Sequence, residues 1–318
     1  MTGRYLNRRD LIAAGALDWD AALADVHDAL ALLRAGMAEM AAENVLPLGT
    51  DPRARGYGLP ARVGGRFAAA GLKWAVHRPE APQGGEAITS RTILDDLETG
   101  LPMGIVDSAM LTRVRTAALS GSVVRALKPG VRRIAILGAG AQAQMHLRMA
   151  RAVFPDLAEV HHWTRSGRAI EAPEGIEIRR HRTASEASLT AEVTFACTSA
   201  PEPILGPEVM ARGALILQIG YHEVSFDAID RADAVTCDLW GDFARTSAKS
   251  LFQMHRAGRF PADRIAADAA AILLDGWRPD PAACVYFSSF GLNIFDIALA
   301  ARLMRRATDL GLGQILTD

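Results

Sequence analysis

Residues 132–146 read RRIAILGAGAQAQMH, and the fold expected for the chain follows from this stretch. A short apolar run leads into closely spaced small residues and then into a helical pattern, which predicts a strand, a tight turn and a helix. Gly138 would allow the sharp turn out of the strand, Gly140 would let the backbone approach a phosphate, and Ala143 would let the helix pack closely on the sheet. Because the unpaired N–H groups at the start of such a helix attract anions, the motif predicts dinucleotide binding.

The sequence after this motif supports that interpretation, although small residues also gather where a helix simply crosses a strand closely. A second apolar run at 160–163 follows at the distance of a β-α-β unit. It ends in TRSGR, residues 164–168, and not in a carboxylate that would bind a ribose hydroxyl. Two guanidinium groups and two hydroxyls suit a 2′-phosphate, so NADP(H) is expected in preference to NAD(H), with an ordinary basic turn as the alternative. The residues concerned are Thr164, Arg165, Ser166 and Arg168.

Length and composition predict a two-domain, enzyme-like protein. The chain has 318 residues, half of them hydrophobic, and a formal net charge of −1, which leaves no electrostatic footprint for nucleic acid or an anionic membrane. There is no apolar run of transmembrane length, and charged residues at 8–10 stand where a signal peptide would be apolar, so a cytoplasmic protein is expected. No metal site is expected either, because three cysteines lack metal-ligand spacing and are interpreted as buried thiols: Cys197, Cys237 and Cys284.

The two sides of the glycine motif predict different architectures. Before it, a helix over 18–41 and a loop-rich, Pro- and Gly-containing segment at 46–62 precede a meander of short strands at 72–77, 88–94 and 102–106. After it, short buried runs are typical of a parallel sheet, at 176–178, 193–199, 214–220 and 234–238. Two further helices are expected over 109–127 and about 294–310. The fold class is therefore α/β.

Several candidate site residues follow from these positions. Ligands of parallel sheets bind beyond the carboxyl ends of the strands, which selects Thr198, Ser199, Tyr221 and His222. His222 is either a proton donor or a structural histidine.

Two basic residues precede the glycine motif. Lys73, in an apolar strand, is either an edge residue reaching solvent or a positive charge inside a cleft, where Leu72, Trp74 and Val76 would exclude water. Arg115, expected with Thr116 near the first turn of the 109–127 helix, is either an anion ligand or a solvated side chain.

In their joint order, these motifs resemble the ornithine cyclodeaminase/mu-crystallin family over nearly the whole chain. The matching pieces are Leu59-Pro60-Ala61, Gly71-Leu72-Lys73, Glu98-Thr99-Gly100, Arg115-Thr116-Ala117-Ala118, Gly138–Ala143 and Phe287-Ser288-Ser289-Phe290-Gly291. The resemblance implies a Rossmann-type doubly wound sheet over residues 131–276. It also implies an α+β substrate and dimerisation domain, built from the N-terminal segment 1–130 and C-terminal helices in 277–318, and hence a homodimer.

The resemblance also implies roles for individual residues. Lys73 would lie beside the substrate carboxylate and the reacting centre, and further substrate contacts would come from Arg62, Arg115 and Phe290. The implied cofactor contacts outside the basic turn are Thr116, Gly138, Gly140, Ala141, Gln142, Thr198, Ser199 and Ser289. The family's upstream arginine has no clean match, so Arg53, Arg55 or Arg62 is expected to replace it.

One departure from the family pattern separates the activities within it. Cyclodeaminases carry an aspartate shortly after the strand that ends here at Gly220, whereas this chain continues Tyr221-His222-Glu223. Segments 71–74 and 287–298 are instead similar to the dehydrogenase branch of 2,3-diaminopropionate biosynthesis. We therefore expect an NAD(P)H-dependent oxidoreductase acting on C–N bonds of a small amino or imino acid, with Lys73, Arg115 and His222 as catalytic residues. The alternatives are a redox-neutral deaminase and an NADPH-dependent binding protein for small molecules.

Overall fold

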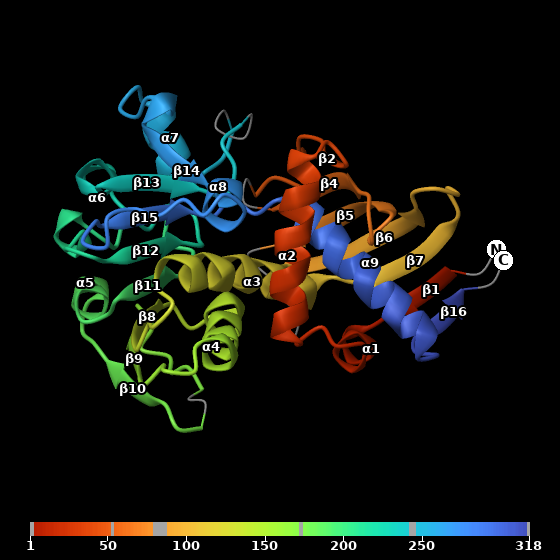
Figure 1. The fold of residues 1–318 in the computed structure, drawn as a ribbon, viewed down its shortest axis with the longest axis horizontal. Coiled ribbons are helices and arrows are strands. Elements are labelled where there is room, and N and C mark those ends of the chain that lie inside the picture. The colour runs from red at the N-terminus through yellow and green to blue at the C-terminus, as the bar shows by residue number, and fades with distance from the viewer. Residues whose placement is uncertain (1–2, 52–53, 79–87, 172–173, 242–245, 317–318) are drawn as a thin grey trace. The chain divides into compact units, whose positions relative to one another are not determined.

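A computed structural model describes residues 3–51, 54–78, 88–171, 174–241 and 246–316, which form two compact units (Figure 1). The first unit comprises the chain up to Arg115 together with the segment from Leu292, and the second runs from Thr116 to Gly291. These limits differ from the domain boundaries expected at 130/131 and 276/277. Helix α3, Ala109–Leu127, crosses the first limit, and strand β15, Val285–Ser288, pairs inside the sheet of the second unit.

The second unit contains an eight-stranded sheet in the order β10-β9-β8-β11-β12-β15-β13-β14, and every pairing in it is parallel. From β8 the chain builds outward on one side through β9 and β10, and then returns to build the other side from β11. This reversal confirms the doubly wound, Rossmann-type sheet. The strands are β8 Arg133–Leu137, β9 Glu159–Trp163, β10 Glu177–Arg180, β11 Val193–Ala196, β12 Leu215–Gln218, β13 Ala234–Cys237, β14 Ile265–Asp268 and β15.

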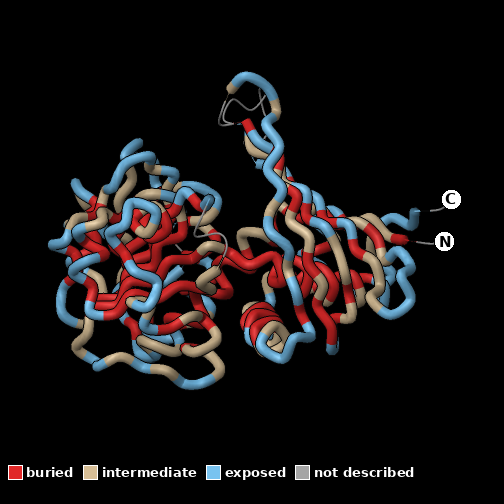
Figure 2. The backbone as a smooth tube through the Cα atoms, turned by 90° about the horizontal axis from the view of Figure 1, so that it is seen from above, coloured by how far each residue is buried: buried red, intermediate tan, exposed pale blue. Residues whose placement is uncertain are grey.

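The central strands of this sheet are buried at every position, which is what near-continuous apolar runs predict for a parallel sheet with both faces covered (Figure 2). Short helices with side-chain N-caps lie between the strands: Thr183 caps α5, Ser225 caps α6 and Asp268 caps α8. The helices are α4 Ala141–Val153, α5 Ala184–Leu189, α6 Phe226–Arg231, α7 Ser250–Arg256 and α8 Ala269–Leu273, with 3₁₀ turns at Pro207–Val209 and Ala262–Arg264.

The first unit contains a second sheet, in the order β16-β1-β7-β6-β5-β4-β2, with β3 also paired to β4. The pairings from β4 to β7 are antiparallel, which confirms the meander. The strands are β1 Gly3–Leu6, β2 Ala38–Met40, β3 Asn44–Pro47, β4 Arg55–Val63, β5 Ala69–His77, β6 Ile88–Asp96, β7 Pro102–Asp107 and β16 Gln314–Leu316.

The expectation of a loop-rich segment over 46–62 was wrong for most of its length, because β4 occupies its second half. Gly56 does not make a turn but allows close packing of β4 on Trp74 of β5. A Cβ atom at this position would lie 2.5 Å from the ring of Trp74. Helix α2 also ends earlier than expected. It spans Trp19–Arg34, and Gly36 then takes a φ of 71°, which ends the helix before β2.

Helices α2 and α9, Asn293–Asp309, lie against one face of this sheet, and short α1, Arg8–Ala13, packs on α9 (Figure 1). Side chains of a strand point alternately to its two faces, so one set of β5 residues meets α9 and the other set does not. Gly71 belongs to the α9 set, because a Cβ atom there would lie 2.9 Å from Ile297. Among the described residues, no helix is both long and apolar enough to cross a bilayer.

Candidate active site

Lys73 is buried inside the first unit. Its strand β5 lies between β4 and β6, and the residue is only 2% exposed. Two residues after Gly71, its side chain points to the α9 face, where Nζ lies 2.7 Å from Oδ2 of Asp296. The edge interpretation is therefore excluded, and the lysine is a positive charge inside the protein.

The carboxylate of Asp296 pairs with two cationic side chains. Besides Lys73, Nε of Arg115 lies 3.3 Å from its Oδ1, and all three side chains are at least nine-tenths buried. Burial lowers the pKa of Lys73, although Asp296 opposes this shift. Burial raises the pKa of Asp296, but Arg115 and Lys73 outweigh it, so the net shift is downward. Two buried cations thus share one carboxylate.

Asp296 was not predicted from the sequence, and neither was Glu43, which interacts electrostatically with Lys73. Burial raises the pKa of Glu43, and the positive charge of Lys73 partly offsets this effect. A half-buried carboxyl group with a raised pKa beside a lysine can carry a proton at pH values where an exposed glutamate would be ionised.

A hydroxyl network fixes the start of α3, the helix that carries Arg115. Thr92, directly opposite Lys73 on β6, donates from Oγ1 to Oγ of Ser108 at 2.9 Å, and Ser108 donates to Oγ of Ser90 at 3.3 Å. Ser108 immediately precedes α3, so Arg115 lies in the second turn of this helix. The sequence had placed it near the first turn. From this position on α3, Arg115 reaches the carboxylate of Asp296 and does not lie at the start of the helix.

The structure does not bring Arg62 to Lys73. In the β4–β5 register Lys73 lies opposite Leu59, and Arg62, three residues further, points to the other face of the sheet. There it pairs with Glu39 of β2 at 2.9 Å. Arg55 lies on the same face as Lys73, but four residues from Leu59, which is about 13 Å along the strand. Arg53 lies outside the described residues.

The water-excluding neighbours of Lys73 were also misassigned. Leu72 and Trp74 point to the opposite face and are 38% and 37% exposed. Helix α9, with fully buried Ile297 next to Asp296, covers the lysine instead. Adjacent residues of a strand cannot desolvate each other, because they lie on different faces.

The second unit carries the predicted strand–turn–helix. Gly138, with φ of 105°, follows β8, and a Cβ atom there would lie 2.5 Å from the carbonyl oxygen of Cys197. Gly140 is the N-cap of α4 without a side-chain cap, and a Cβ atom on it would meet no other atom within 4 Å. The start of α4, at Ala141, thus faces open space, as a pyrophosphate site requires.

Buried polar atoms at the same edge of the sheet fit a dinucleotide too. Among the described residues, Oε1 of Gln142 and Oγ of Ser289 are buried without a hydrogen-bond partner. Ser289 directly follows β15, and its own N–H donates to the carbonyl oxygen of Gln218. Phe290 comes next, with its ring 6.2 Å from that of Phe252. Orphaned buried polar atoms are uncommon in native proteins, and a ligand can satisfy them.

A tight turn that contains two arginines follows β9. Gly167, with φ of 68°, donates its N–H to the carbonyl oxygen of Thr164 at 3.1 Å, and the hydroxyls of Thr164 and Ser166 are 3.5 Å apart. Arg165 and Arg168 are both exposed. An exposed turn with two guanidinium groups agrees with 2′-phosphate binding and equally with the alternative of a basic surface turn.

Thr198, a predicted cofactor contact, is hydrogen-bonded to Glu223 within the protein. Its N–H and hydroxyl donate to Oε1 of Glu223 at 2.7 and 3.0 Å, whereas Ser199 beside it is exposed. Burial raises the pKa of Glu223 to about 7, against the charge of Lys249. Glu223, which the sequence analysis did not select, thus anchors the end of β11, and Thr198 is engaged by protein.

His222 lies on the loop after β12, next to exposed Tyr221. Its Nδ1 is 3.0 Å from Oγ of Ser250, and its ring meets Phe226 edge-on. Burial lowers the pKa of His222 from its ordinary value, and Glu202 partly opposes this shift. The role of His222 as a proton donor therefore stays a prediction, as does the alternative of a structural histidine. Thr116, the remaining predicted cofactor contact, is buried on α3.

The three cysteines are buried free thiols, as expected. Within the described part of the chain, no cluster of three or more His, Cys, Asp or Glu side chains is placed to hold a metal ion.

Known proteins resemble this chain both in sequence and in structure. The family model for the ornithine cyclodeaminase/mu-crystallin family matches residues 14–310. NAD(P)H-dependent anabolic L-arginine dehydrogenase DauB of Pseudomonas aeruginosa is 30% identical over 231 residues, covering 70% of this chain and 73% of that protein. Delta(1)-pyrroline-2-carboxylate reductase of Bacillus cereus is 28% identical over 264 residues, covering 77% and 80%.

Two solved structures share the fold. Delta(1)-pyrroline-2-carboxylate reductase of Thermococcus litoralis, in complex with NADH and L-proline, superposes with a TM-score of 0.87 at 21% identity, covering 98% of this chain and 99% of that one. An archaeal alanine dehydrogenase dimer with bound NAD gives 0.85 at 23% identity, covering 100% and 99%.

Proposed function

The chain belongs to the ornithine cyclodeaminase/mu-crystallin family, and from this we propose that it is an NAD(P)H-dependent oxidoreductase acting on the C–N bond of a small amino or imino acid. The named relatives support this reaction class, because they are NAD(P)H-dependent dehydrogenases and reductases of such compounds. NADP(H) is the proposed preferred cofactor, on the strength of the basic turn at 164–168.

The buried Lys73–Asp296–Arg115 group is the observation that carries the proposal. Burying a charge without a partner is strongly unfavourable, and here two cations face one carboxylate. The excess positive charge is suited to the carboxylate of an incoming substrate. Lys73 has three donors and Arg115 five, so both can keep Asp296 and bind a second carboxylate. They would thereby fix the substrate carbon that bears the nitrogen.

The nitrogen end of the substrate requires a group that can move a proton. Nζ of Lys73, with its lowered pKa, can release a proton to the substrate nitrogen and take it back, with Asp296 stabilising the charged form. Glu43 is the second candidate, because its raised pKa lets it carry a proton and its ionised form would attract an iminium or ammonium group. A bound nicotinamide supplies hydride to the carbon of the C–N bond, or accepts it in reverse.

The proposed activity is tested by following NADPH oxidation with 2-oxo acids plus ammonia or amines, and with cyclic imino acids. Consumption of NADPH with formation of the matching amino acid is the expected result. Ammonia release from a diamino acid without net change in NADPH would indicate redox-neutral deamination. Saturable binding without turnover across the panel would indicate a binding protein.

Cofactor preference gives a separate prediction. Arg165→Ala should weaken NADPH binding by roughly 10- to 100-fold, because a charged bidentate contact contributes about 1.5–3 kcal/mol, and should leave NADH binding nearly unchanged. Arg212→Ala, an exposed arginine in the turn before β12, is the matched control and should alter neither. Titration of both cofactors by protein fluorescence measures the effect. Equal losses for NADPH and NADH at Arg165 would refute the 2′-phosphate assignment.

A homodimer is proposed through the sheet face that α9 does not cover. Leu72, Trp74 and Ile93 project from this face and are all more than one-third exposed. Trp74→Glu should raise the dimer dissociation constant by roughly 30-fold or more, since a central tryptophan contributes about 2 kcal/mol or more to an interface. Leu189→Glu, at a more exposed apolar site on α5, should leave it unchanged. Sedimentation at micromolar concentration tests this, and a monomeric wild-type chain would contradict it.

A further inference from the structure

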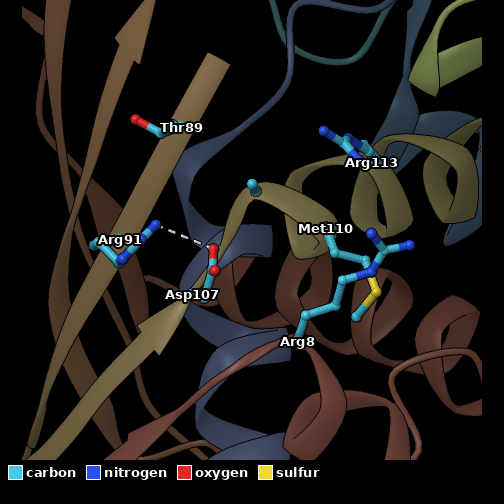
Figure 3. A pocket seen from close by; sticks show the side chains of 7 residues that line it. Arg8, Thr89, Arg91, Asp107, Met110 and Arg113 are labelled. Carbon is cyan, nitrogen blue, oxygen red and sulfur yellow. Dashed lines mark hydrogen bonds and ion pairs between the residues drawn. The ribbon is translucent and has the colours of Figure 1, made fainter. Parts of the chain in front are cut away.

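Charged side chains outside the Lys73 site gather at two places. In the first unit, a pocket of about 220 Å³ lies between β6, β7 and the start of α3, where Nη1 of Arg91 pairs with Asp107 at 3.1 Å (Figure 3). Both side chains are partly exposed, so this pair contributes little to the fold. In the second unit, by contrast, Lys249, Glu223 and Asp238 are all more than nine-tenths buried. Because burying a charge is costly, this group of three indicates a specific role.

Two of the three hold the chain just beyond β11 and β12, at the carboxyl edge of the parallel sheet. Glu223 accepts the N–H and the hydroxyl of Thr198, which lies two residues after β11, at 2.7 and 3.0 Å. Lys249 is the N-cap residue of α7. Its Nζ donates to the carbonyl oxygens of Ile219 and Gly220, the first two residues after β12, at 2.6 Å each.

Asp238 holds the chain beyond β15 in the same way. It directly follows β13, and its Oδ2 accepts the N–H of Gly291, three residues after β15. Its Oδ1 accepts the N–H of Leu239 at 3.0 Å. The turn held in this way contains Ser289, whose buried hydroxyl has no hydrogen-bond partner among the described residues. The strands concerned are neighbours, in the order β11-β12-β15-β13, so three buried charges fix four adjacent strand ends.

Lys249 also acts electrostatically on both carboxyl groups. Burial raises the pKa of Glu223 to about 7 and raises that of Asp238 as well, and the charge of Lys249 opposes both shifts. The lysine thereby favours ionised carboxylates, which accept stronger hydrogen bonds than neutral carboxyl groups. The group is also closely packed, because a Cβ atom on Gly220 would overlap the carbonyl oxygen of Thr198 and Oε1 of Glu223. The ends of β11 and β12 are therefore in direct contact.

We propose that Lys249, Glu223 and Asp238 are positioning residues for the nicotinamide half of the cofactor site, an inference that rests on the proposed dinucleotide-dependent function. In a doubly wound sheet, the half that begins with the glycine motif binds the first nucleotide and the pyrophosphate, and the strands beyond the reversal bind the second nucleotide. The four strand ends held by the buried charges all belong to the strands beyond the reversal. The three residues would act through the backbone that they hold, and not by touching the cofactor.

Cofactor fragments separate this role from general support of the fold. NADPH and 2′-phospho-ADP-ribose, which lacks the nicotinamide, are titrated calorimetrically into the full-length protein, and NADH and ADP-ribose likewise. Lys249→Met should weaken binding of the whole cofactors roughly tenfold or more, because both carboxyl groups lose their cation and the chain after β12 loses two donors. Binding of the two fragments should barely change. Lys249→Arg, which keeps the charge, should lose much less affinity than Lys249→Met.

Asp238→Asn is the second variant, because it keeps the shape of the side chain and weakens its hold on Gly291. It should show the same selective loss of the whole cofactors. Lys128→Met is the matched control in the same unit. Nζ of Lys128 lies 3.8 Å from the position of a Cβ atom on Gly213, in the turn before β12 and hence at the opposite edge of the sheet. This variant should bind all four compounds as the wild type does.

The outcomes distinguish the positioning role from the proposed function. Selective loss of the whole cofactors supports the positioning role. Unchanged affinities in both Lys249→Met and Asp238→Asn would overturn it, and so would equal losses of cofactors and fragments in both, since the residues would then support the whole unit. A wild-type chain that binds none of the four compounds would refute the proposed function itself.

Discussion

Replacing Lys73 by Met is expected to lower kcat/KM by roughly 10²-fold or more, while the affinity for NADPH barely changes. Met preserves the length of the side chain and removes only its charge and its proton. Asp296 keeps Arg115 as a partner, so the variant should still fold. The loss therefore reports the missing contact with the substrate carboxylate and the missing proton at Nζ. Steady-state kinetics with the substrate found by the screen, together with a cofactor titration, measures both quantities.

Arg62→Met is the informative comparison, because Arg62 lies on the next strand but on the opposite face of the sheet. Its partner Glu39 is largely exposed, so stability should change within about 0.5 kcal/mol and turnover should remain close to that of the wild type. Near-normal kcat/KM in Lys73→Met would defeat the proposed mechanism. A large loss in Arg62→Met would show that the substrate binds on the other face.

Local patterns were sufficient to predict the strand–turn–helix at Gly138 and the meander. About ten residues are enough to show a glycine between an apolar run and a helical pattern. The same length shows the alternation of apolar and polar residues in a hairpin strand. β15, VYFS, was not predicted, because residues 277–318 were assigned to the returning C-terminal segment, yet it lies between β12 and β13. Its position shifts the limit of the second unit to Gly291.

Among the site residues, too, those with a local sequence signal were predicted and those that depend on tertiary packing were not. Lys73 was selected because a charged side chain is unusual in an apolar strand. Its partner Asp296 is 223 residues away and lies on another element. A signal for Asp296 was present, since it is a charged residue among the buried side chains of α9, and the others are uncharged. Pairing it with Lys73 requires knowledge of how α9 packs on β5. Strand alternation alone, by contrast, could have placed Leu72 and Trp74 on the opposite face from Lys73.

Asp296→Asn is expected to be the more destabilising change at this site, because it leaves two buried cations without a carboxylate. Removal of one partner from a buried ion pair costs about 3–5 kcal/mol, and here the remaining cations also repel each other. Urea unfolding at pH 7 should show a loss of this order, and kcat/KM should fall as well, since Asp296 holds both Lys73 and Arg115.

The pH dependence of this loss follows from Lys73. Asp296 raises the pKa of Lys73 against the effect of burial, so its removal should lower that pKa further below the ordinary value of 10.5. A lysine whose pKa is lower in the folded chain destabilises the fold progressively as pH falls from 10.5 to the folded pKa, because in that window the unfolded chain binds a proton that the folded chain does not. The stability deficit of Asp296→Asn should therefore be larger at pH 7 than at pH 9.5.

The double variant Lys73→Met with Asp296→Asn isolates the cause of this deficit. Removing the lysine from the Asn background leaves one buried cation in place of two, so part of the lost stability should return and the difference between pH 7 and pH 9.5 should shrink. Urea unfolding of the wild type, both single variants and the double variant at the two pH values completes the cycle. Strictly additive losses, or a deficit of Asp296→Asn that does not depend on pH, would mean that Lys73 and Asp296 do not form the coupled charge pair on which the proposed site depends.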